Sequence, residues 1–138
     1  MELTDLSHCS FRYQLQMKMT TSIVLSVLLV ALFSLRVQGA SIASGGSHSC
    51  AQLTAGQVKC WGDNDNGGQL GDGTTITERT TPVEVSGITT ATSIALGESH
   101  SCAVLAGGNA KCWGNNGSGR LGDGTTADRV TSVEVAGI

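Results

Sequence analysis

The sequence predicts an all-β chain built from two copies of one four-stranded unit, and three observations support this prediction. Residues 93–103 repeat residues 41–51 at an offset of 52, and residues 111–114 repeat residues 59–62 at the same offset. A period near 50 residues is typical of propeller blades and similar arrays, in which each unit buries its apolar face against a neighbour. Outside the first forty residues, no segment with helical periodicity competes with the short β-prone runs.

Four short strands are expected in each unit. A tight turn at 54–57 joins the second strand to the third, and the fourth begins after Pro82, which suits the start of a strand and not its centre. The connection at 62–81 is a loop by composition, since it is rich in Gly, Asn, Asp and Thr. The expected strands are 41–44, 49–53, 58–61 and 83–85 in the first unit, and 94–95, 101–105, 110–113 and 133–135 in the second.

The two units differ in length only within their long loops. The offset between the copies falls to 51 at Leu70 and Leu121 and to 50 at Val83 and Val133, so two single-residue deletions lie between the strands. Segments that tolerate changes of length are loops. The sequence therefore divides into a leader (1–39), a first repeat (40–88) and a second repeat (89–138).

The leader is expected to be a secretory signal peptide. Residues 23–35 form an apolar run of 13 residues that two serines interrupt, and Arg12 and Lys18 precede it. A charged start, an apolar run of about 7–15 residues and a small-residue exit are typical of secretion, whereas a membrane span needs about 20 apolar residues. Cleavage is expected after Gly39, which leaves an extracellular chain with no stable membrane span. An uncleaved signal that anchors the chain in a membrane is the alternative.

The charge of residues 40–138 argues against a nucleic-acid binder. This part carries nine acidic and five basic side chains, a net charge of −4, and its basic residues do not cluster. A protein that neutralises phosphates shows a basic patch or stripe. Large apolar side chains are few, and the only aromatic ones here are Trp61 and Trp113. Because so few large apolar side chains cannot fill one conventional core, we expect them to pack between the units.

The residues around the two tryptophans resemble a known repeat. The first copy reads His48-Ser49-Cys50-Ala51, then Gly56, Val58, Trp61-Gly62, Asn64 and Gly68-Gln69-Leu70-Gly71; the second ends Trp113-Gly114-Asn115-Asn116-Gly117-Ser118-Gly119-Arg120-Leu121-Gly122. This pattern resembles the repeat of the regulator of chromosome condensation family. The second copy departs from it with Arg120 in place of the usual Gln and with Ala110 in place of Val58, and the first has one extra residue before Leu70.

The resemblance implies four-stranded antiparallel blades that in this family close, typically seven together, into a β-propeller. The chain is therefore expected to be two blades of a larger propeller. Known relatives act as a nucleotide exchange factor on chromatin, as a plant ultraviolet-B receptor and as a secreted bacterial inhibitor of β-lactamase, so the fold does not fix the task. Because two blades alone leave two faces uncovered, further blades or a homo-oligomer are expected to close a ring.

Two tryptophans and two leucines are expected to pack between blades. Trp61 and Trp113 occupy the same position in the repeat, and each can bury about 150–250 Å². The glycines around Leu70 and Leu121 permit the positive φ of a close turn. Stacking on a sugar or a cation is the alternative for the tryptophans, but a recurring core position explains both copies.

Cysteine pairs recur with a spacing of 10, Cys50 with Cys60 and Cys102 with Cys112. A three-residue loop at 54–56 sets Leu53 opposite Gln57 and therefore Cys50 opposite Cys60, close enough to bridge. In a secreted chain this pattern predicts two disulfides, each within one hairpin. Buried free thiols are the first alternative. Metal binding by Cys50, Cys60 and His48 is the second, although the spacings typical of zinc are absent.

Three further motifs suggest chemistry only weakly. The segment 63–68 begins like a calcium loop, but Thr74 stands where the loop needs Glu, and the second copy replaces its acids. His48 and His100 lie beside serines without a third catalytic partner, so they are interpreted as hydrogen-bonding residues of a strand or turn. Asn116 begins an Asn-Gly-Ser sequon and is a possible glycosylation site in a eukaryote.

These observations favour a secreted, non-catalytic β-propeller module that binds a protein or a glycan, with no cofactor and no metal. The first alternative is a guanine-nucleotide exchange factor or chromatin-associated regulator of the same repeat family, which requires that the leader be no signal. A secreted enzyme inhibitor is the second alternative. An enzyme whose active residues lie outside this sequence is the third.

Overall fold

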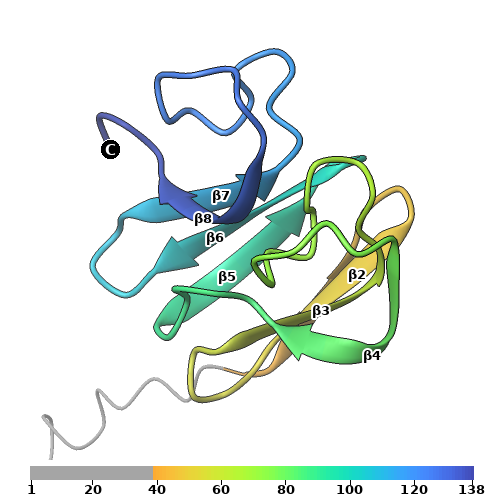
Figure 1. Ribbon diagram of the computed structural model, residues 1–138. Coiled ribbons are helices and arrows are strands. Elements are labelled where there is room, and N and C mark those ends of the chain that lie inside the picture. The colour runs from red at the N-terminus through yellow and green to blue at the C-terminus, as the bar shows by residue number, and fades with distance from the viewer. Residues whose placement is uncertain (1–38) are drawn as a thin grey trace, which may run out of the picture. The chain divides into compact units, whose positions relative to one another are not determined.

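The computed structural model describes residues 39–138, so the expected signal peptide lies outside the described residues. Eight strands form two four-stranded antiparallel sheets, and within each sheet the strands follow one another in chain order (Figure 1). Blade 1 contains β1 (Ser41–Ser44), β2 (His48–Gln52), β3 (Val58–Asp63) and β4 (Glu78–Glu84). Blade 2 contains β5 (Ala91–Leu96), β6 (His100–Leu105), β7 (Ala110–Gly114) and β8 (Arg129–Glu134). The all-β prediction with two four-stranded units is confirmed.

The fourth strand of each blade begins earlier than expected. The prediction that Pro82 opens the strand is wrong, because β4 begins at Glu78 and Pro82 lies inside it. β4 is an edge strand that pairs with β3 alone. The register between the two strands is irregular, because Cys60 pairs with Val83 whereas Gly62 pairs with Arg79. An edge with such an irregularity tolerates a residue without a backbone N–H.

The tight turn after β2 explains one glycine of the repeat. The Leu53 amide donates to the Gln57 carbonyl at 2.8 Å, and Gly56 closes the turn with a φ of 83°. A Cβ on Gly56 would lie 2.8 Å from the carbonyl oxygen of Thr89 in the link to blade 2. Only glycine satisfies both the left-handed backbone and this close approach.

The two blades pack side by side, with β5 of blade 2 against β1 and β2 of blade 1 (Figure 1). Backbone hydrogen bonds cross the junction from Gly46 to the Glu98 carbonyl at 3.2 Å and from Gly73 to the Val130 carbonyl at 2.9 Å. The buried core draws on both blades and comprises Cys50, Val58, Cys60, Leu70, Val85, Ile88, Ala91, Ala103 and Trp113. Within residues 39–138 there is no helix long and apolar enough to cross a membrane.

Each blade has two distinct ends. The long-loop end carries the turns 45–47 and 97–99 and the long loops 64–77 and 115–128, and the short-turn end carries the remaining turns. Residues 53–57, 85–90 and 106–109 of the short-turn end include no charged side chain. A cavity of about 260 Å³ opens there between Gly56, Thr90 and Ala106. The charged side chains of the described loops therefore lie at the long-loop end.

Candidate functional site

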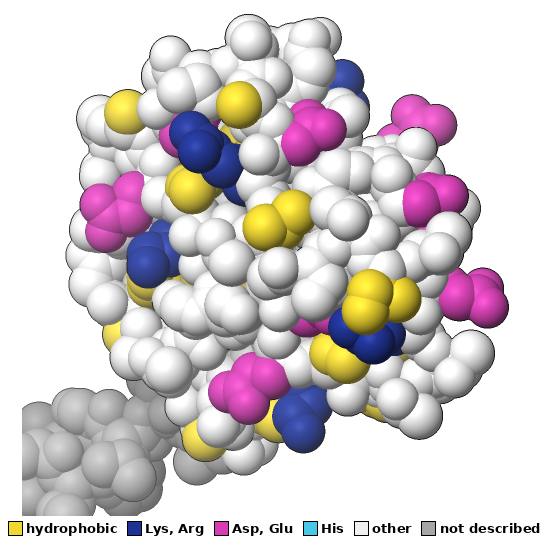
Figure 2. Space-filling view, viewed as in Figure 1, with side chains coloured by type: hydrophobic (Ala, Val, Ile, Leu, Met, Phe, Trp, Pro, Cys, Tyr) yellow, Lys and Arg dark blue, Asp and Glu magenta, His cyan; other side chains and the backbone are white. Residues whose placement is uncertain are grey.

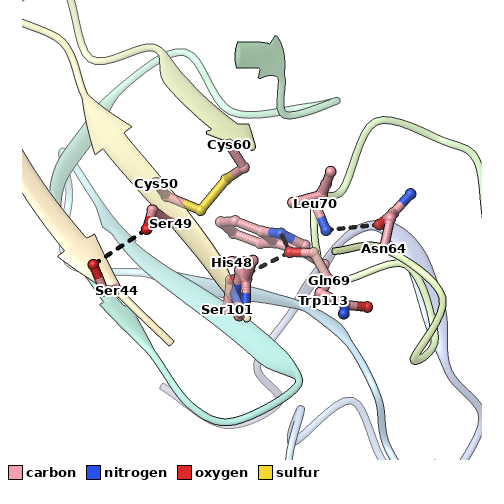
Figure 3. Close-up of a disulfide and its surroundings, with 10 residues drawn as sticks. All are labelled: Ser44, His48, Ser49, Cys50, Cys60, Asn64, Gln69, Leu70, Ser101 and Trp113. Carbon is pink, nitrogen blue, oxygen red and sulfur yellow. Dashed lines mark hydrogen bonds between the residues drawn. A yellow bond between two sulfur atoms is a disulfide. The ribbon is translucent and has the colours of Figure 1, made fainter. Parts of the chain in front are cut away.

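The Trp113 side chain is the wedge that joins the two blades. Trp113 is fully buried, and its indole Nε1 donates to the Gln69 carbonyl of blade 1 at 2.9 Å (Figure 3). A Cβ on Gly71 would lie 2.7 Å from Cδ1 of this ring, so the ring fills the space above that glycine. Trp61 holds the same position in blade 1 and is only half-buried. The two tryptophans thus share a place in the repeat but differ in what covers them.

Two asparagines organise the long loops from within. Leu70 and Leu121 are fully buried, and their amides donate to Asn64 Oδ1 at 2.9 Å and to Asn116 Oδ1 at 3.0 Å. Neither asparagine is exposed to solvent. A buried amide that bonds the backbone on both sides holds its loop in one conformation.

The possible glycosylation at Asn116 is not available in the folded chain. Its Nδ2 donates to Asp123 Oδ1 at 3.2 Å and to the Ala127 carbonyl at 3.0 Å, and the whole side chain is buried. A glycan is bulky and lies at the surface, so a glycosylated Asn116 could not keep its buried position. The sequon coincides with the loop-organising asparagine of the repeat, which is why the motif alone was misleading.

We expect protein secreted from a eukaryotic host to carry no glycan at Asn116, because the attached sugar would exclude the amide from its buried position. Intact mass before and after peptide N-glycosidase checks this. Ser118→Ala is the control, since Ser118 is exposed and its loss destroys the sequon while leaving Asn116 in place. A mass difference that this variant abolishes would contradict the buried position.

Each long loop is closed by an aspartate–arginine pair. Arg79 Nε and Nη2 donate to Asp72 Oδ2 at 3.0 and 2.9 Å, and Arg129 Nε donates to Asp123 Oδ2 at 2.7 Å. The hydrogen bond from the Thr125 hydroxyl is the main reason that the pKa of Asp123 falls to about 2, against the raising effect of burial. These carboxylates stay ionised and keep the loops closed over a wide pH range.

A histidine–serine pair crosses the junction beside Trp113. His48 Nε2 lies 2.8 Å from Ser101 Oγ, and that hydroxyl donates its proton to the Gln69 carbonyl at 3.1 Å (Figure 3). Since the serine has only one proton to give, Nε2 of His48 must be the donor to Oγ. Sequence reasoning placed His48 in a strand or turn and missed its partner. The recurrence of His-Ser in both copies was the available signal.

Burial lowers the pKa of His48, and the neighbouring His100 lowers it further, while Asp63 opposes them. Burial also lowers the pKa of His100. In the neutral His48 ring, Nδ1 is buried and has no hydrogen-bond partner within the described residues. A proton placed there would add a buried charge with no acceptor, so the junction favours the neutral ring.

We expect the free energy of unfolding to fall as the pH drops below about 6.5. In this range His48 and His100 bind protons in the unfolded chain but stay neutral in the folded chain. Urea titrations at a series of pH values measure this slope. His48→Gln keeps a donor that does not titrate, so the slope should decrease, and His48→Gln/His100→Gln should remove it. An unchanged slope in the double variant would assign the acid sensitivity to other groups. Asp123 titrates far below this window.

The glycine three residues before each histidine makes room for the ring. A Cβ on Gly45 would lie 2.5 Å from His48 Cε1 and would collide with the Gly97 carbonyl of blade 2. Gly45→Ala is therefore expected to cost about 1–3 kcal/mol of stability through overpacking. Gly117→Ala is the matched control, since its nearest neighbour there lies at an ordinary 3.5 Å. Equal urea midpoints for the two variants would contradict this packing.

The cysteines face each other as the hairpin register requires. Cys50 stands opposite Cys60 with sulfurs 2.07 Å apart, and Cys102 stands opposite Cys112 with sulfurs 2.12 Å apart (Figure 3 shows the first pair). The Cα atoms of each pair are separated by 4.1 Å. Among residues 39–138 no three His, Cys, Asp or Glu side chains gather in a metal-binding arrangement.

The long-loop end is acidic. Four exposed carboxylates lie there with no ion-pair partner in the described part of the chain, namely Asp65, Glu78, Glu98 and Asp128. Figure 2 shows acidic side chains gathered along the right-hand edge of the molecule. Asp65 and Asp128 lie on loops held by the asparagines and aspartate–arginine pairs, whereas Glu78 begins β4 and Glu98 lies in the turn 97–99.

Comparison with known proteins shows the same repeat. Profiles of the regulator of chromosome condensation (RCC1) repeat match residues 55–104, and 40–67 with 91–120. Over 69% of this chain it is 35% identical to the human E3 ubiquitin-protein ligase HERC2, and over 76% it is 35% identical to the ultraviolet-B receptor UVR8 of Arabidopsis thaliana. The secretion-regulating guanine nucleotide exchange factor of Bos taurus is 34% identical over 72% of the chain.

Solved structures agree with this assignment. Human WBSCR16 superposes on 69% of the chain with a TM-score of 0.61 and 28% identity, and Prp20p of Saccharomyces cerevisiae with a TM-score of 0.60 and 23% identity. The chain spans a small share of these proteins, 25% of either structure and 2%, 25% and 23% of HERC2, the exchange factor and UVR8. With its two four-stranded sheets and their tryptophan junction, the chain belongs to the regulator of chromosome condensation (RCC1) repeat family.

Proposed function

We propose that this chain is an exported, non-catalytic binding module that recognises a protein partner through its long-loop end. The observation that carries the proposal is the set of four exposed carboxylates at the long-loop end that have no ion-pair partner among the described residues. These four carboxylates outnumber Arg120, the one exposed cation of the described long loops, and such a net negative charge steers association and favours a partner with a basic surface. The described loops of the short-turn end carry no charged side chain.

A protein partner fits better than a glycan. Among the described residues a tryptophan for stacking on a sugar could come only from the half-buried Trp61, because Trp113 is fully buried. Structural relatives also have protein partners: Prp20p is described with its binding to Gsp1p and histones, and Kap60 has been crystallised bound to yeast RCC1. Inhibition of a secreted enzyme is one form that such protein binding could take.

Nucleotide exchange is the rival function, because one relative is a secretion-regulating guanine nucleotide exchange factor. Nucleotide release from a small GTPase of the Ran type distinguishes the two. The binding module leaves the release rate unchanged, whereas accelerated release by the purified chain would favour the exchange factor. Export is tested separately by N-terminal sequencing of protein recovered from the medium, where a chain that begins at Ala40 is expected.

The role of the acidic end is tested with two charge-matched variants. A partner is captured from the medium with the wild-type chain, identified, and titrated against Glu78→Gln/Glu98→Gln and against Glu84→Gln/Glu134→Gln. The first variant removes charge from the long-loop end and should weaken binding and its salt dependence. The second removes the same charge at exposed positions at the opposite end of β4 and β8. Equal affinities for the two variants would overturn the proposed surface.

A further inference from the structure

The outer faces of the blade pair carry the two halves of the junction that joins blade 1 to blade 2. The head face is the side of blade 1 that bears Ser49 and Trp61, and the tail face is the side of blade 2 that bears His100 and Arg120. Ser49 stands directly opposite Trp61, so both side chains point the same way from the sheet. The equivalent pair on β6 and β7 points at blade 1 and forms the internal junction.

Three polar groups of the internal junction recur on the outer faces without a hydrogen-bond partner in the described part of the chain. Inside, Ser101 and Trp113 donate to the carbonyl of Gln69. In the repeat, Trp61 of blade 1 is equivalent to the donor Trp113, and the Arg120 carbonyl of blade 2 is equivalent to the Gln69 carbonyl that accepts. Within residues 39–138, the Trp61 indole N–H, the Arg120 carbonyl and Nε2 of His100 make no hydrogen bond, whereas Nε2 of His48 bonds Ser101. The Trp61 N–H of the head face thus has the free Arg120 carbonyl of the tail face as its counterpart, and Nε2 of His100 has the Ser49 hydroxyl, which bonds the Ser44 hydroxyl at 3.2 Å.

Apolar side chains are also left exposed on both faces. Ile42 of the head face is 69% exposed, whereas Ile94, its equivalent in blade 2, packs against the core. Val104 of the tail face is 40% exposed, whereas Gln52, its equivalent in blade 1, is 1% exposed. The difference in each case is the presence of a neighbouring blade. Joining head to tail would bury both residues.

One pair of positions changes charge together, and this change points to the occupant. At the internal junction the chain around the neutral Gln69 meets the chain around the neutral Asn115. A Cβ built on Gly114 would lie 3.1 Å from the Gln69 Cα, and one built on Gly67 would lie 3.0 Å from the Asn115 Cα and 2.8 Å from Asp128 Oδ2. The equivalent outer positions hold Arg120 on the tail face and Asp63 on the head face. Neither has an ion-pair partner among the described residues.

We propose that the head face of one copy docks on the tail face of a second copy, through the hydrogen bonds of the internal junction and an ion pair between Arg120 and Asp63. Such a contact is heterologous, so it closes into a ring or continues as a chain.

Sedimentation of the purified chain at increasing concentration tests the proposal. The wild-type chain should form species at whole-number multiples of its own monomer mass. Arg120→Gln and Asp63→Asn should each weaken this association at least about tenfold. Both variants install the residue that the other repeat already carries at that position, so the fold is kept. Glu134→Gln is the control for loss of a charge. Glu134 stands opposite Lys111, whose Nζ donates to the Gly87 carbonyl of blade 1, so Glu134 lies on the inner side of blade 2 and not on the tail face.

Charge reversal separates a head-to-tail contact from any symmetric one. Arg120→Asp and Asp63→Arg should each stay monomeric alone, and an equimolar mixture should assemble, because alternating copies then form an opposite-charge pair at every junction. Circular dichroism confirms that each variant is folded. A wild-type chain that is monomeric throughout the micromolar range would overturn the proposal, as would a mixture that fails to assemble.

Discussion

Replacing Trp113 by alanine is expected to lower the free energy of unfolding by about 3–5 kcal/mol, because a fully buried indole is removed and the Gln69 carbonyl loses a donor. This is the largest effect we expect from a single substitution. Trp61→Ala is the matched control, with the same chemistry at the same repeat position and only a half-buried ring. Urea unfolding at a concentration where the copies stay apart measures both losses.

The difference between the two variants is the informative quantity. If the junction is as described, Trp61→Ala loses less than half as much stability as Trp113→Ala. Equal losses would mean that both rings are packed alike, and that the contacts of the Trp113 side chain with blade 1 add nothing to the free energy of unfolding. The control also removes the trivial explanation that any tryptophan in this repeat is equally important to its own sheet.

Loss of the hairpin disulfides is expected to have the second largest effect. A bridge that closes a loop of about ten residues constrains the unfolded chain by about 2.5–3 kcal/mol on the loop-entropy model. Cys50→Ala/Cys60→Ala and Cys102→Ala/Cys112→Ala should therefore each destabilise the chain by roughly this amount, and dithiothreitol should destabilise the wild type by the sum. Reductant should have no further effect on a variant that lacks all four cysteines.

Peptide mapping without reduction identifies the pairs themselves. We expect two peptides with one bridge each, Cys50 with Cys60 and Cys102 with Cys112, as the 4.1 Å Cα separations allow. Bridges between blades, or four thiols that alkylate freely in exported protein, would contradict the assignment.

The hairpins could be predicted from sequence because their geometry is local. A turn of fixed length sets the register of two strands, and from the register follow the opposed cysteines and the shared face of Ser49 and Trp61. The position of Trp113 was also predictable, since a large side chain that recurs in a repeat has few other places to go.

The junction itself could not be predicted in detail because its partners are distant in sequence. His48 and Ser101 are separated by 53 residues, and Trp113 and Gln69 by 44. The repeat shows that each of these residues matters without showing which atoms meet. Asn116 was misleading for a related reason: the Asn-Gly-Ser letters are identical for an exposed acceptor and for a buried amide, and only burial separates them.

The central claim is that the two repeats are blades fastened to each other, and hydrogen exchange of the junction N–H groups in the purified chain tests it most directly. Gly46 and Gly73 donate their amides across the junction, and Trp113 donates its indole N–H. We expect all three to be protected as strongly as the central amides of β2 and β6. Exchange of these groups at the rate of open loops, with the strand amides still protected, would show two independent sheets and contradict the account.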